Sequence, residues 1–544
     1  MIASGAGIVR VVLPRAPTPG PADSTSKAAS ATAKPPTSPR RRTLRRSDLL
    51  FLIALVVLSG SLRLVDLDRN PPELFEDELS GVVSAWSIAT TGHDVGRTVL
   101  PFMVTRLELK QPIYFLATVP FQAVLGDGAF AVRLPAVIFG VASTLLIVWL
   151  LVILRAGRRV ALLGGILFAI SPWAIHYARA GWEPAAFLPF TLAGTGLLWL
   201  GLQQHRRWTT IGAAAVFAVG AYTYHPALLM HVVLAATVTV IHARSLQRSD
   251  LVTLGIGAVV AILILVPYGV AIQDPLFLQR TRALSVFRSG VTSDALQLAW
   301  GDFWAQWSPA YLIGGAAPNP RINPGILVYA WTVPFLVLGL DRLAHRRRRE
   351  DLLLLAWLIL GALPAAISDD RTTPHAARGL AALPALVMIT AIGLGRSVRW
   401  LRAGDWSFRS RRLAAAGILA IAVVSLASFE RTYLGEYVLR SANWWGYGSG
   451  AALRTAGATV PPDGQLCIAT PDISGFTFTQ QVIYYLPDHP FAIHRGLGDP
   501  ACRQPGTYLL ALSDRELDVS ASEIATIPGI AGKPLFRLSR VDGP

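Results

Sequence analysis

The sequence predicts an all-α polytopic membrane protein, with a small C-terminal α/β domain outside the membrane. Hydrophobic residues make up 53% of the 544 residues, charged residues only 15%, and the mean hydropathy is +0.47. A soluble domain carries about 25% charged residues. The apolar residues gather in stretches of about 20, the length of a helix that crosses a bilayer. The 49 Lys and Arg residues fall in short runs between these stretches, so the net charge of +16 predicts a lipid bilayer as partner, and no nucleic acid.

The first 47 residues precede the apolar stretches and are rich in Pro, Ala, Ser and Thr. They carry nine Lys and Arg residues against one acid, Asp23. Because such a segment has too little apolar surface to form a core, residues 1–47 are expected to be a disordered basic tail in the cytoplasm. The following apolar run, residues 49–65, is long enough to be a retained first span rather than part of a cleaved signal.

Eleven apolar stretches are predicted to span the membrane, within a transmembrane domain of residues 48–429. They lie at about 48–66, 129–154, 160–177, 185–203, 209–224, 226–243, 251–270, 324–343, 351–367, 379–398 and 412–429. With the N-terminus inside, Arg-rich loops such as Arg346–Arg349 fall on the cytoplasmic side. Pro112–Leu125 is also apolar but short, and a re-entrant or interfacial helix is expected there. The Ala- and Arg-rich composition is typical of a high-GC bacterium, so we expect a multi-pass protein of the bacterial inner (plasma) membrane.

Three predicted outer segments are long, at residues 67–128, 271–323 and 430–544. The last is expected to be a separate extracytoplasmic α/β domain. After an aromatic-rich, helix-like start, it contains three short β-like runs, Gln465–Ala469, Tyr508–Leu512 and Leu535–Val541. Both cysteines, Cys467 and Cys502, lie in it, on the oxidising side of the membrane. The sequence leaves open whether they form a disulfide or stay separate thiols.

The first long outer segment contains the strongest candidate for chemistry, three consecutive acids, Glu76-Asp77-Glu78, after a Pro-Pro turn. Apolar residues at positions 79, 82, 83 and 86 predict that an amphipathic helix begins here and lies on the membrane surface. In a structural interpretation, Asp77 caps this helix and Glu78 faces its positive end. A functional interpretation competes with it, because capping needs one acid rather than three, and acids beside a bilayer are costly.

Other outer loops place further charged residues close to the membrane. Residues 179–184 form a whole short loop that contains Arg179 and Glu183, for which a structural ion pair is the alternative. Lys110 precedes the short apolar helix and Arg378 precedes a late span; lone cations at span ends are usually anchors. Carboxylates and cations together on the outer face suit transfer from a lipid-linked phosphate, because cations hold the phosphate while a carboxylate accepts the proton of an incoming hydroxyl.

The chain resembles the GT-C superfamily of integral membrane glycosyltransferases, and within it the bacterial protein O-mannosyltransferase and aminoarabinose-transferase-like group, glycosyltransferase family 39. The matching stretches are PPELFEDELSGVVSAWSIATTGHD, LKQPIYFLATVPFQAVLGDGAFAVRLPAVIFG, LFAISPWAIHYARAGWEP and AYTYHPAL. The resemblance implies a polyprenyl-phosphate-linked sugar donor, mannose by default. It also implies transfer with inversion to an acceptor on the outer face. Protein, lipid and glycan acceptors of the cell envelope all stay open.

The resemblance also implies roles for single residues. Asp77 matches a general base and Glu78 a neighbour that orients it. Glu183 matches a second acidic position, at which many relatives carry Asp. Lys110 matches the lysine that meets the lipid phosphate, although relatives often read Lys-Pro-Pro where this chain has Lys-Gln-Pro. Arg378 matches a second phosphate ligand.

Two further assignments depend more on position. Arg179 is added as a phosphate ligand because it lies beside Glu183. Tyr224 and His225 match a Tyr-His pair near the cavity of the family, with an interfacial aromatic belt as the alternative.

No cofactor is predicted with certainty. A divalent cation held by Asp77 and Glu183 would suit the same chemistry, but no Cys/His cluster with zinc-ligand spacing and no Gly-rich phosphate loop before a helix indicates one. The alternative to a glycosyltransferase is a transporter or flippase of a lipid-linked glycan. The paired repeats typical of transporters are not seen, and the acids cluster on one face rather than at the midplane.

Overall fold

The computed structural model describes residues 46–93, 103–104, 109–275, 277, 282–315, 319–368, 374–469, 481–487, 489–530 and 532–542. All but the last two residues of the predicted tail, 1–47, lie outside this part of the chain, so the prediction of disorder stays untested.

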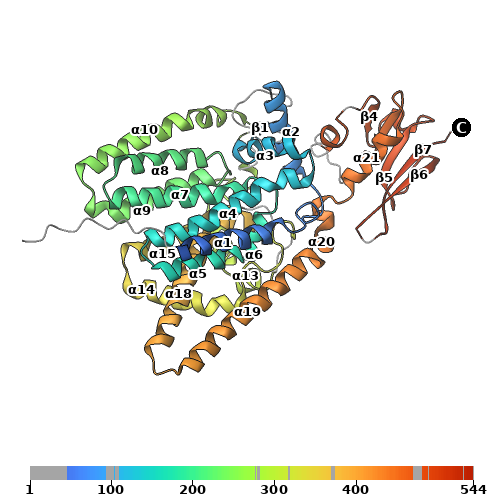
Figure 1. Cartoon of the computed structure of the whole chain (residues 1–544). Helices are drawn as coiled ribbons and strands as arrows, with labels where there is room; N and C mark the ends of the chain where they lie inside the picture. Colours follow the sequence, from blue (N-terminus) through green and yellow to red (C-terminus); the bar gives the residue numbers. More distant parts are fainter. Residues whose placement is uncertain are drawn as a thin grey trace, which may run out of the picture. The chain divides into compact units, whose positions relative to one another are not determined.

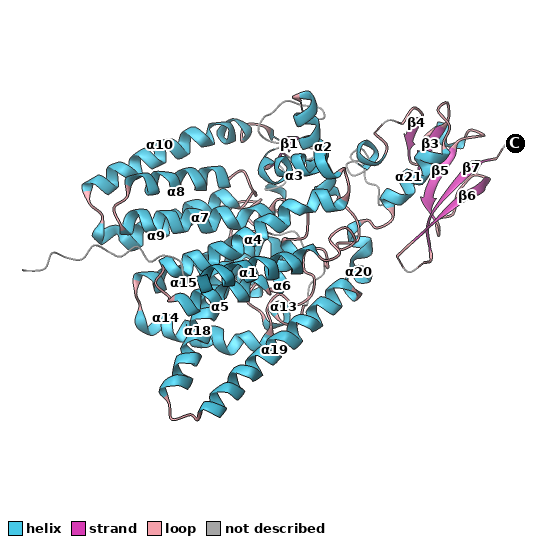
Figure 2. Cartoon of the chain, in the orientation of Figure 1, coloured by secondary structure: helices cyan, strands magenta, loops and turns pink. Residues whose placement is uncertain are grey.

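The described residues up to 459 are mainly helical, and a small sheet follows (Figures 1 and 2). The α-helices are α1 Arg46–Leu64, α2 Glu76–Thr91, α3 Pro112–Leu125, α4 Ala129–Ile153, α5 Arg158–Ala169, α6 Pro172–Tyr177, α7 Pro184–Gln203, α8 Arg207–Gly220, α9 Ala227–His242, α10 Arg248–Ala271, α12 Ser293–Ala305, α13 Pro309–Leu312, α14 Val333–Arg346, α15 Arg349–Leu360, α16 Leu363–Ala366, α17 Ala376–Gly379, α18 Leu383–Ala403, α19 Phe408–Leu434, α20 Glu436–Ser441 and α21 Ser449–Thr459.

Seven helical segments in the described part are long and apolar enough to cross a membrane, which confirms a polytopic membrane protein. They are α1, α4, α7, α9 with its short extension to Ser245, α10, α17–α18 taken together, and α19. The other four predicted spans are also helical, but α8, α14 and α15 are shorter, and the span at 160–177 is divided into α5 and α6. Pro172 causes this division, since it begins α6 behind the cap residue Ser171. The predicted count of eleven spans is therefore not confirmed.

The helices pack closely where small residues let their backbones approach. Neighbours such as α7, α8 and α10 lie side by side (Figure 1), and α18 packs against α14, α5 and α15. At the α14–α18 crossing, a Cβ on Gly393 would lie 1.8 Å from the carbonyl oxygen of Phe335, so only glycine fits. Close approach through small residues is the usual way in which membrane helices gain contact area.

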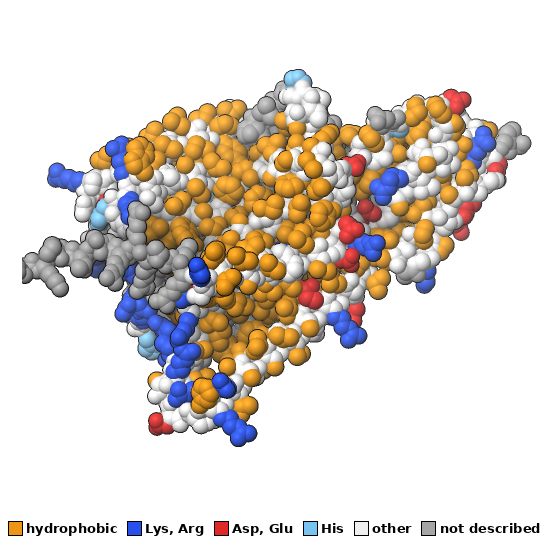
Figure 3. All heavy atoms as spheres, in the orientation of Figure 1, with side chains coloured by type: hydrophobic (Ala, Val, Ile, Leu, Met, Phe, Trp, Pro, Cys, Tyr) orange, Lys and Arg blue, Asp and Glu red, His pale blue; other side chains and the backbone are white. Residues whose placement is uncertain are grey.

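The outer surface of the helical region is apolar. Exposed side chains such as Val57, Ile262 and Val424 are each more than 60% accessible, and hydrophobic groups cover most of the face in Figure 3. In the same view, Lys and Arg side chains gather at the end of the helices where α14 meets α15 and α18 meets α19. An apolar band with a basic edge is the surface that a bilayer and its headgroups cover.

A five-stranded sheet forms most of the C-terminal region, in the order β4-β3-β5-β7-β6. Its strands are β3 Gln465–Ile468, β4 Ala492–Arg495, β5 Tyr508–Leu512, β6 Ala521–Pro528 and β7 Pro534–Val541. β3 is parallel to β4 and β5, whereas β7 is antiparallel to β5 and β6. The three predicted β-like runs are thus strands of one sheet. Leu453 of α21 packs on the sheet beside Leu510 and Leu538, which confirms a small α/β unit at the C-terminus.

The two cysteines are joined. A disulfide links Cys467 on β3 to Cys502 in the short turn of helix before β5, and both residues are completely buried. Of the two arrangements that the sequence left open, the structure therefore contains the disulfide.

Candidate active site

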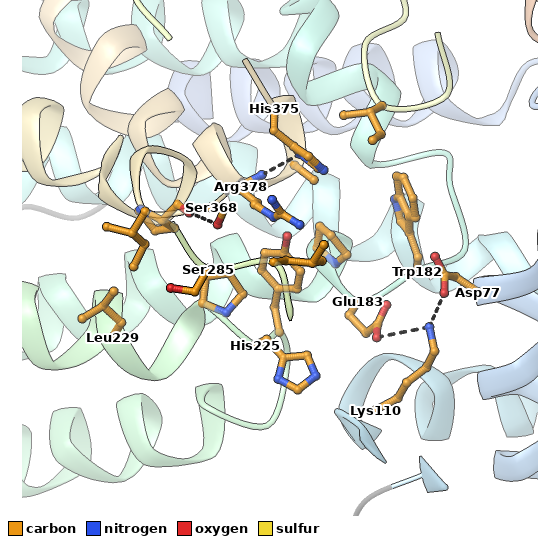
Figure 4. A pocket seen from close by; sticks show the side chains of 18 of the residues that line it. Asp77, Lys110, Trp182, Glu183, His225, Leu229, Ser285, Ser368, His375 and Arg378 are labelled. Atoms are coloured by element: carbon orange, nitrogen blue, oxygen red, sulfur yellow. Dashed lines mark hydrogen bonds and ion pairs between the residues drawn. The ribbon is translucent and has the colours of Figure 1, made fainter. Parts of the chain in front are cut away.

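A cavity of about 310 Å³ brings six of the predicted site residues together. Among its lining residues are Asp77, Lys110, Glu183, Tyr224, His225 and Arg378. These residues come from α2, the strand before α3, the loop before α7, the α8–α9 loop and α17. All of these positions lie at the ends of helices that are opposite to the Arg-rich turns, because successive long helices reverse the direction of the chain. Figure 4 shows the acidic residues and Arg378 in different parts of the cavity.

Lys110 lies between the two cavity carboxylates. Its Nζ atom is 2.5 Å from Oδ1 of Asp77 and 3.8 Å from Oε1 of Glu183 (Figure 4). The Lys110 side chain is only 1% exposed, and a buried ammonium group needs such partners because leaving water is costly. Lys110 ends a short strand, β2 Leu109–Lys110, which pairs with β1 Met103–Val104, and α3 begins two residues later.

Asp77 does not cap the helix that it belongs to. Helix α2 begins at Glu76 after the cap residue Phe75, so Asp77 is the second helical residue. Glu78 instead accepts a hydrogen bond from the backbone N–H of Phe75 at 2.8 Å. The predicted capping by Asp77 is therefore wrong, whereas the prediction that Glu78 faces the positive helix end agrees with this contact.

Glu78 does not line the cavity, because its carboxylate is completely buried behind it. Arg133 of α4 donates to it from Nε at 3.1 Å and from Nη2 at 3.3 Å. The backbone N–H of Gly181 donates at 2.6 Å, and a Cβ on Gly181 would lie 2.8 Å from Oε1 of Glu78. Glu78 thus holds the start of α2, on which Asp77 lies, and the 178–183 loop. Its role in orienting Asp77 stays a prediction.

Arg179 is likewise turned away from the cavity. It is fully buried, and its guanidinium donates to backbone carbonyls of Arg63, Asp66 and Asn70 at 3.1, 3.2 and 2.8 Å. Its donors therefore hold the chain between α1 and α2, and Arg179 is not among the residues that line the cavity. The expectation that it binds a phosphate there, or pairs with Glu183, is not supported.

Arg321 is a cavity residue that the sequence did not reveal. Its guanidinium lies over the ring of Phe75, 3.2 Å from the ring centroid. The segment around it is held by α6, since His176 bonds to the carbonyl of Arg321 at 2.8 Å and Tyr177 donates to that of Ile322 at 2.7 Å. No local pattern marks Arg321, because it reaches the cavity only through these long-range contacts.

The other part of the cavity contains Arg378, His375, Ser285 and Ser368 (Figure 4). His375 caps α17, and its Nδ1 accepts a hydrogen bond from the backbone N–H of Arg378 at 3.4 Å. Since Nδ1 is the acceptor, a neutral imidazole here carries its proton on Nε2. Apolar residues complete this part of the wall, namely Leu229, Leu284, Pro364 and Ile367. The acids at 369–370 lie outside the described residues.

The cavity acids do not form a metal site in this arrangement. A cation shared by Asp77 and Glu183 would need the space between them, where Nζ of Lys110 lies. In the described part of the chain, no group of three or more His, Cys, Asp or Glu side chains could hold a metal ion.

These features define a polytopic membrane protein with a charged cavity at one end of its helices, and its fold is that of the GT-C glycosyltransferases. It is similar to apo ArnT from Cupriavidus metallidurans, with a TM-score of 0.56 and 17% identity over 92% of this chain and 100% of that one. The same protein bound to undecaprenyl phosphate has a TM-score of 0.52 and 16% identity, over 91% of this chain and 99% of that one. The apo oligosaccharyltransferase of Archaeoglobus fulgidus has a TM-score of 0.52 and 13% identity, over 85% of this chain and 69% of that one.

At the level of sequence, residues 110–270 match the family of dolichyl-phosphate-mannose-protein mannosyltransferases. None of the curated proteins matches the chain. The family match and the shared fold together confirm the resemblance to GT-C glycosyltransferases.

Proposed function

We propose that this protein is a membrane glycosyltransferase that moves a sugar from a polyprenyl-phosphate donor to a hydroxyl group of an acceptor, with inversion and with Asp77 as the general base. The observation that carries the proposal is the contact between Asp77 and Lys110 in the cavity, 2.5 Å apart. It combines a carboxylate that can accept a proton with a cation that can attract a phosphate. The match of residues 110–270 to a mannosyltransferase family supports mannose as the first sugar to test.

The cavity suits a donor that is anionic at one end and apolar at the other. Lys110 in one part of the cavity and Arg378 in the other supply cations that would attract the phosphate, while Leu229, Leu284 and Ile367 offer an apolar wall to a prenyl chain. One similar protein of known structure, ArnT, binds undecaprenyl phosphate. Tyr224 and His225 also line the cavity and would contact the donor.

The reaction exchanges one bond at the anomeric carbon for another. The acceptor oxygen forms a bond to the anomeric carbon as the bond from that carbon to the phosphate oxygen breaks, and the hydroxyl proton passes to Asp77. Polyprenyl phosphate leaves as a stable anion, so the transfer needs no strong general acid. Lys110 would stabilise the charge that develops on the phosphate, and Glu183 would hold Lys110 in place.

The distribution of charges supports one orientation in the membrane. Arg-rich turns such as Arg346–Arg349 lie at one end of the helices and the cavity at the other. Because short cytoplasmic loops carry the excess of Lys and Arg, we place the cavity and the α/β domain of residues 430–544 on the outer face of a bacterial inner membrane. The acceptor would be a protein, lipid or glycan of the cell envelope.

An assay of donor consumption by membranes tests the proposal. Membranes that contain the wild type or Asp77→Asn would receive labelled polyprenyl-phosphate mannose, followed by a panel of other lipid-linked sugars. We expect the wild type alone to consume a donor, since the amide of Asn accepts no proton. Near-normal consumption by Asp77→Asn would exclude Asp77 as the base. Movement of the lipid-linked sugar across the bilayer without consumption would instead support the transporter alternative.

A further inference from the structure

The segment that carries Asp77 contacts both the end of α19, the last helix of the transmembrane region, and the chain that follows it. Asn70 donates from Nδ2 to the carbonyl of Tyr433 at 2.8 Å. The ring of Phe75 meets that of Trp445 edge to face, with centroids 6.1 Å apart. Between these two contacts, the Glu73 carboxylate points to the C-terminal region. Several contacts along a few residues restrict this segment far more than a single contact would.

Both oxygens of the Glu73 carboxylate accept hydrogen bonds from the C-terminal region. The Tyr485 hydroxyl donates to Oε1 at 2.9 Å, and the backbone N–H of Gly448 donates to Oε2 at 3.2 Å. On the opposite side, Nη2 of Arg133 donates to the carbonyl of Glu73 at 2.6 Å. Glu73 is thus held between α4 and the C-terminal region.

Tyr485 is backed by packing on two sides. Its ring packs with Tyr484 against a cluster of buried residues from α2 and α3 that includes Leu79, Val82 and Phe115. The guanidinium of Arg454 on α21 lies over the same ring, 5.0 Å from its centroid, and α21 itself packs on the sheet. Burial raises the pKa of Tyr485 well above its ordinary value, so its hydroxyl remains a donor at neutral pH. A packed path therefore joins the sheet to Glu73.

The chain between Glu73 and the cavity has little freedom to absorb a displacement. Pro71 and Pro72 fix two backbone φ angles before Glu73. After it, α2 begins at Glu76, with Asp77 in its first turn. A movement of Glu73 must therefore shift the start of α2, and a misplacement of about 1 Å at a reacting group can cost about 100-fold in rate.

We propose that Glu73 is a positioning residue through which the C-terminal domain sets the place of Asp77 in the cavity. This inference rests on the proposed function, in which Asp77 is the base. It gives the C-terminal domain a direct part in the reaction: the domain holds the first outer segment in the geometry that transfer requires. Glu73 itself is not among the residues that line the cavity.

Two substitutions weaken this connection with little change of shape. Glu73→Gln keeps the size of the side chain but removes the charge. Its amide oxygen can still accept from the Gly448 N–H and its amide nitrogen can donate to the Tyr485 hydroxyl, so weaker neutral hydrogen bonds replace the two bonds to a carboxylate. Tyr485→Phe keeps the ring packing and removes only the hydroxyl. Asp68→Asn is a matched control, because Asp68 is an exposed carboxylate in the same segment that pairs loosely with Arg69 at 3.9 Å.

The test uses the full chain in lipid nanodiscs and three measurements on each variant. They are hydrogen exchange of the backbone amides at 74–80, the affinity for undecaprenyl phosphate, and the rate of donor consumption at saturating polyprenyl-phosphate mannose. For Glu73→Gln and Tyr485→Phe, we expect faster exchange at 74–80, an unchanged affinity, and a rate lowered about 10-fold or more. The double variant should be less impaired than the sum of the two single ones, since both act on the same contact. Asp68→Asn should behave as the wild type.

The outcomes separate this inference from the proposed function. Exchange at 74–80 equal to the control in both variants would overturn the positioning role. So would a loss of affinity for undecaprenyl phosphate together with faster exchange throughout the chain, because that pattern is general destabilisation. If the wild type neither binds undecaprenyl phosphate nor consumes a donor, the proposed function fails. The exchange measurement then still decides whether Glu73 holds the segment.

Discussion

Nζ of Lys110 lies 2.5 Å from Oδ1 of Asp77, although the two residues are 33 positions apart and belong to different elements. Glu183, from a third segment, approaches the same ammonium group at 3.8 Å. The proposed base and the proposed phosphate ligand therefore contact each other. Binding of a donor phosphate would draw Lys110 toward a new anion and leave the Asp77 carboxylate available for the acceptor hydroxyl.

Replacing Lys110 should weaken donor binding. We expect Lys110→Ala to lower the affinity for undecaprenyl phosphate by about 10- to 100-fold, since a charge-assisted contact in a buried site contributes about 1.5–3 kcal/mol. Titration of the purified protein in nanodiscs measures this. Lys533→Ala, in the exposed turn between β6 and β7, is the control and should bind normally. An unchanged affinity of Lys110→Ala would exclude a phosphate contact.

The buried pair of Glu78 and Arg133 should stabilise the protein only as a pair. Each single change, Glu78→Gln or Arg133→Met, leaves its partner buried without a counter-charge and should cost about 3–5 kcal/mol. The double variant should be less destabilised than the sum of the two. Thermal unfolding in detergent measures the three variants. Additive losses would mean that the contact at 3.1 Å contributes little.

Stability should depend on pH through Glu73. Burial raises the pKa of its carboxyl, and the hydrogen bonds from Tyr485 and Gly448 lower it only in part. Because the folded-state pKa lies above the unfolded value, the group's contribution to stability is fully present below the unfolded pKa and is lost as pH rises through the folded pKa. As the pH rises above about 4, the ordinary pKa of a glutamic acid, the unfolding temperature of the wild type should therefore fall relative to that of Glu73→Gln. If the unfolding temperature of the wild type, relative to that of Glu73→Gln, stays constant or rises with pH, the pKa of Glu73 is not raised.

The disulfide should contribute substantially to the stability of the C-terminal domain. It closes a loop over a sequence separation of 35 residues, and loop-closure entropy predicts a contribution of about 4 kcal/mol. Cys467→Ser with Cys502→Ser should lower the unfolding temperature of this domain and make its segments easier to cleave by protease. Unchanged resistance to protease in the double variant would show that packing alone holds the sheet.

The sequence predicted the elements well because periodicity and length are local properties. Helix α3 has the bounds Pro112–Leu125 that its apolar run predicted, and the three β-like runs are β3, β5 and β7. The number of spans was harder to predict. Pro172 divides one apolar stretch into two short helices, and hydropathy does not register such a break.

The sequence by itself determined that this is a membrane protein. It also indicated which acids and cations are candidates for chemistry, because charged residues beside membrane spans are energetically unfavourable and therefore rare. Only the tertiary structure decided which candidates meet. Asp77 reaches the cavity while its neighbour Glu78 points into the core toward Arg133, and Arg179 turns to backbone carbonyls. The tertiary structure also places Arg321 at the cavity and brings Glu73 into contact with the C-terminal domain. The physical reason is that burial and hydrogen bonding with distant segments direct each side chain, and neither can be read from the residues beside it.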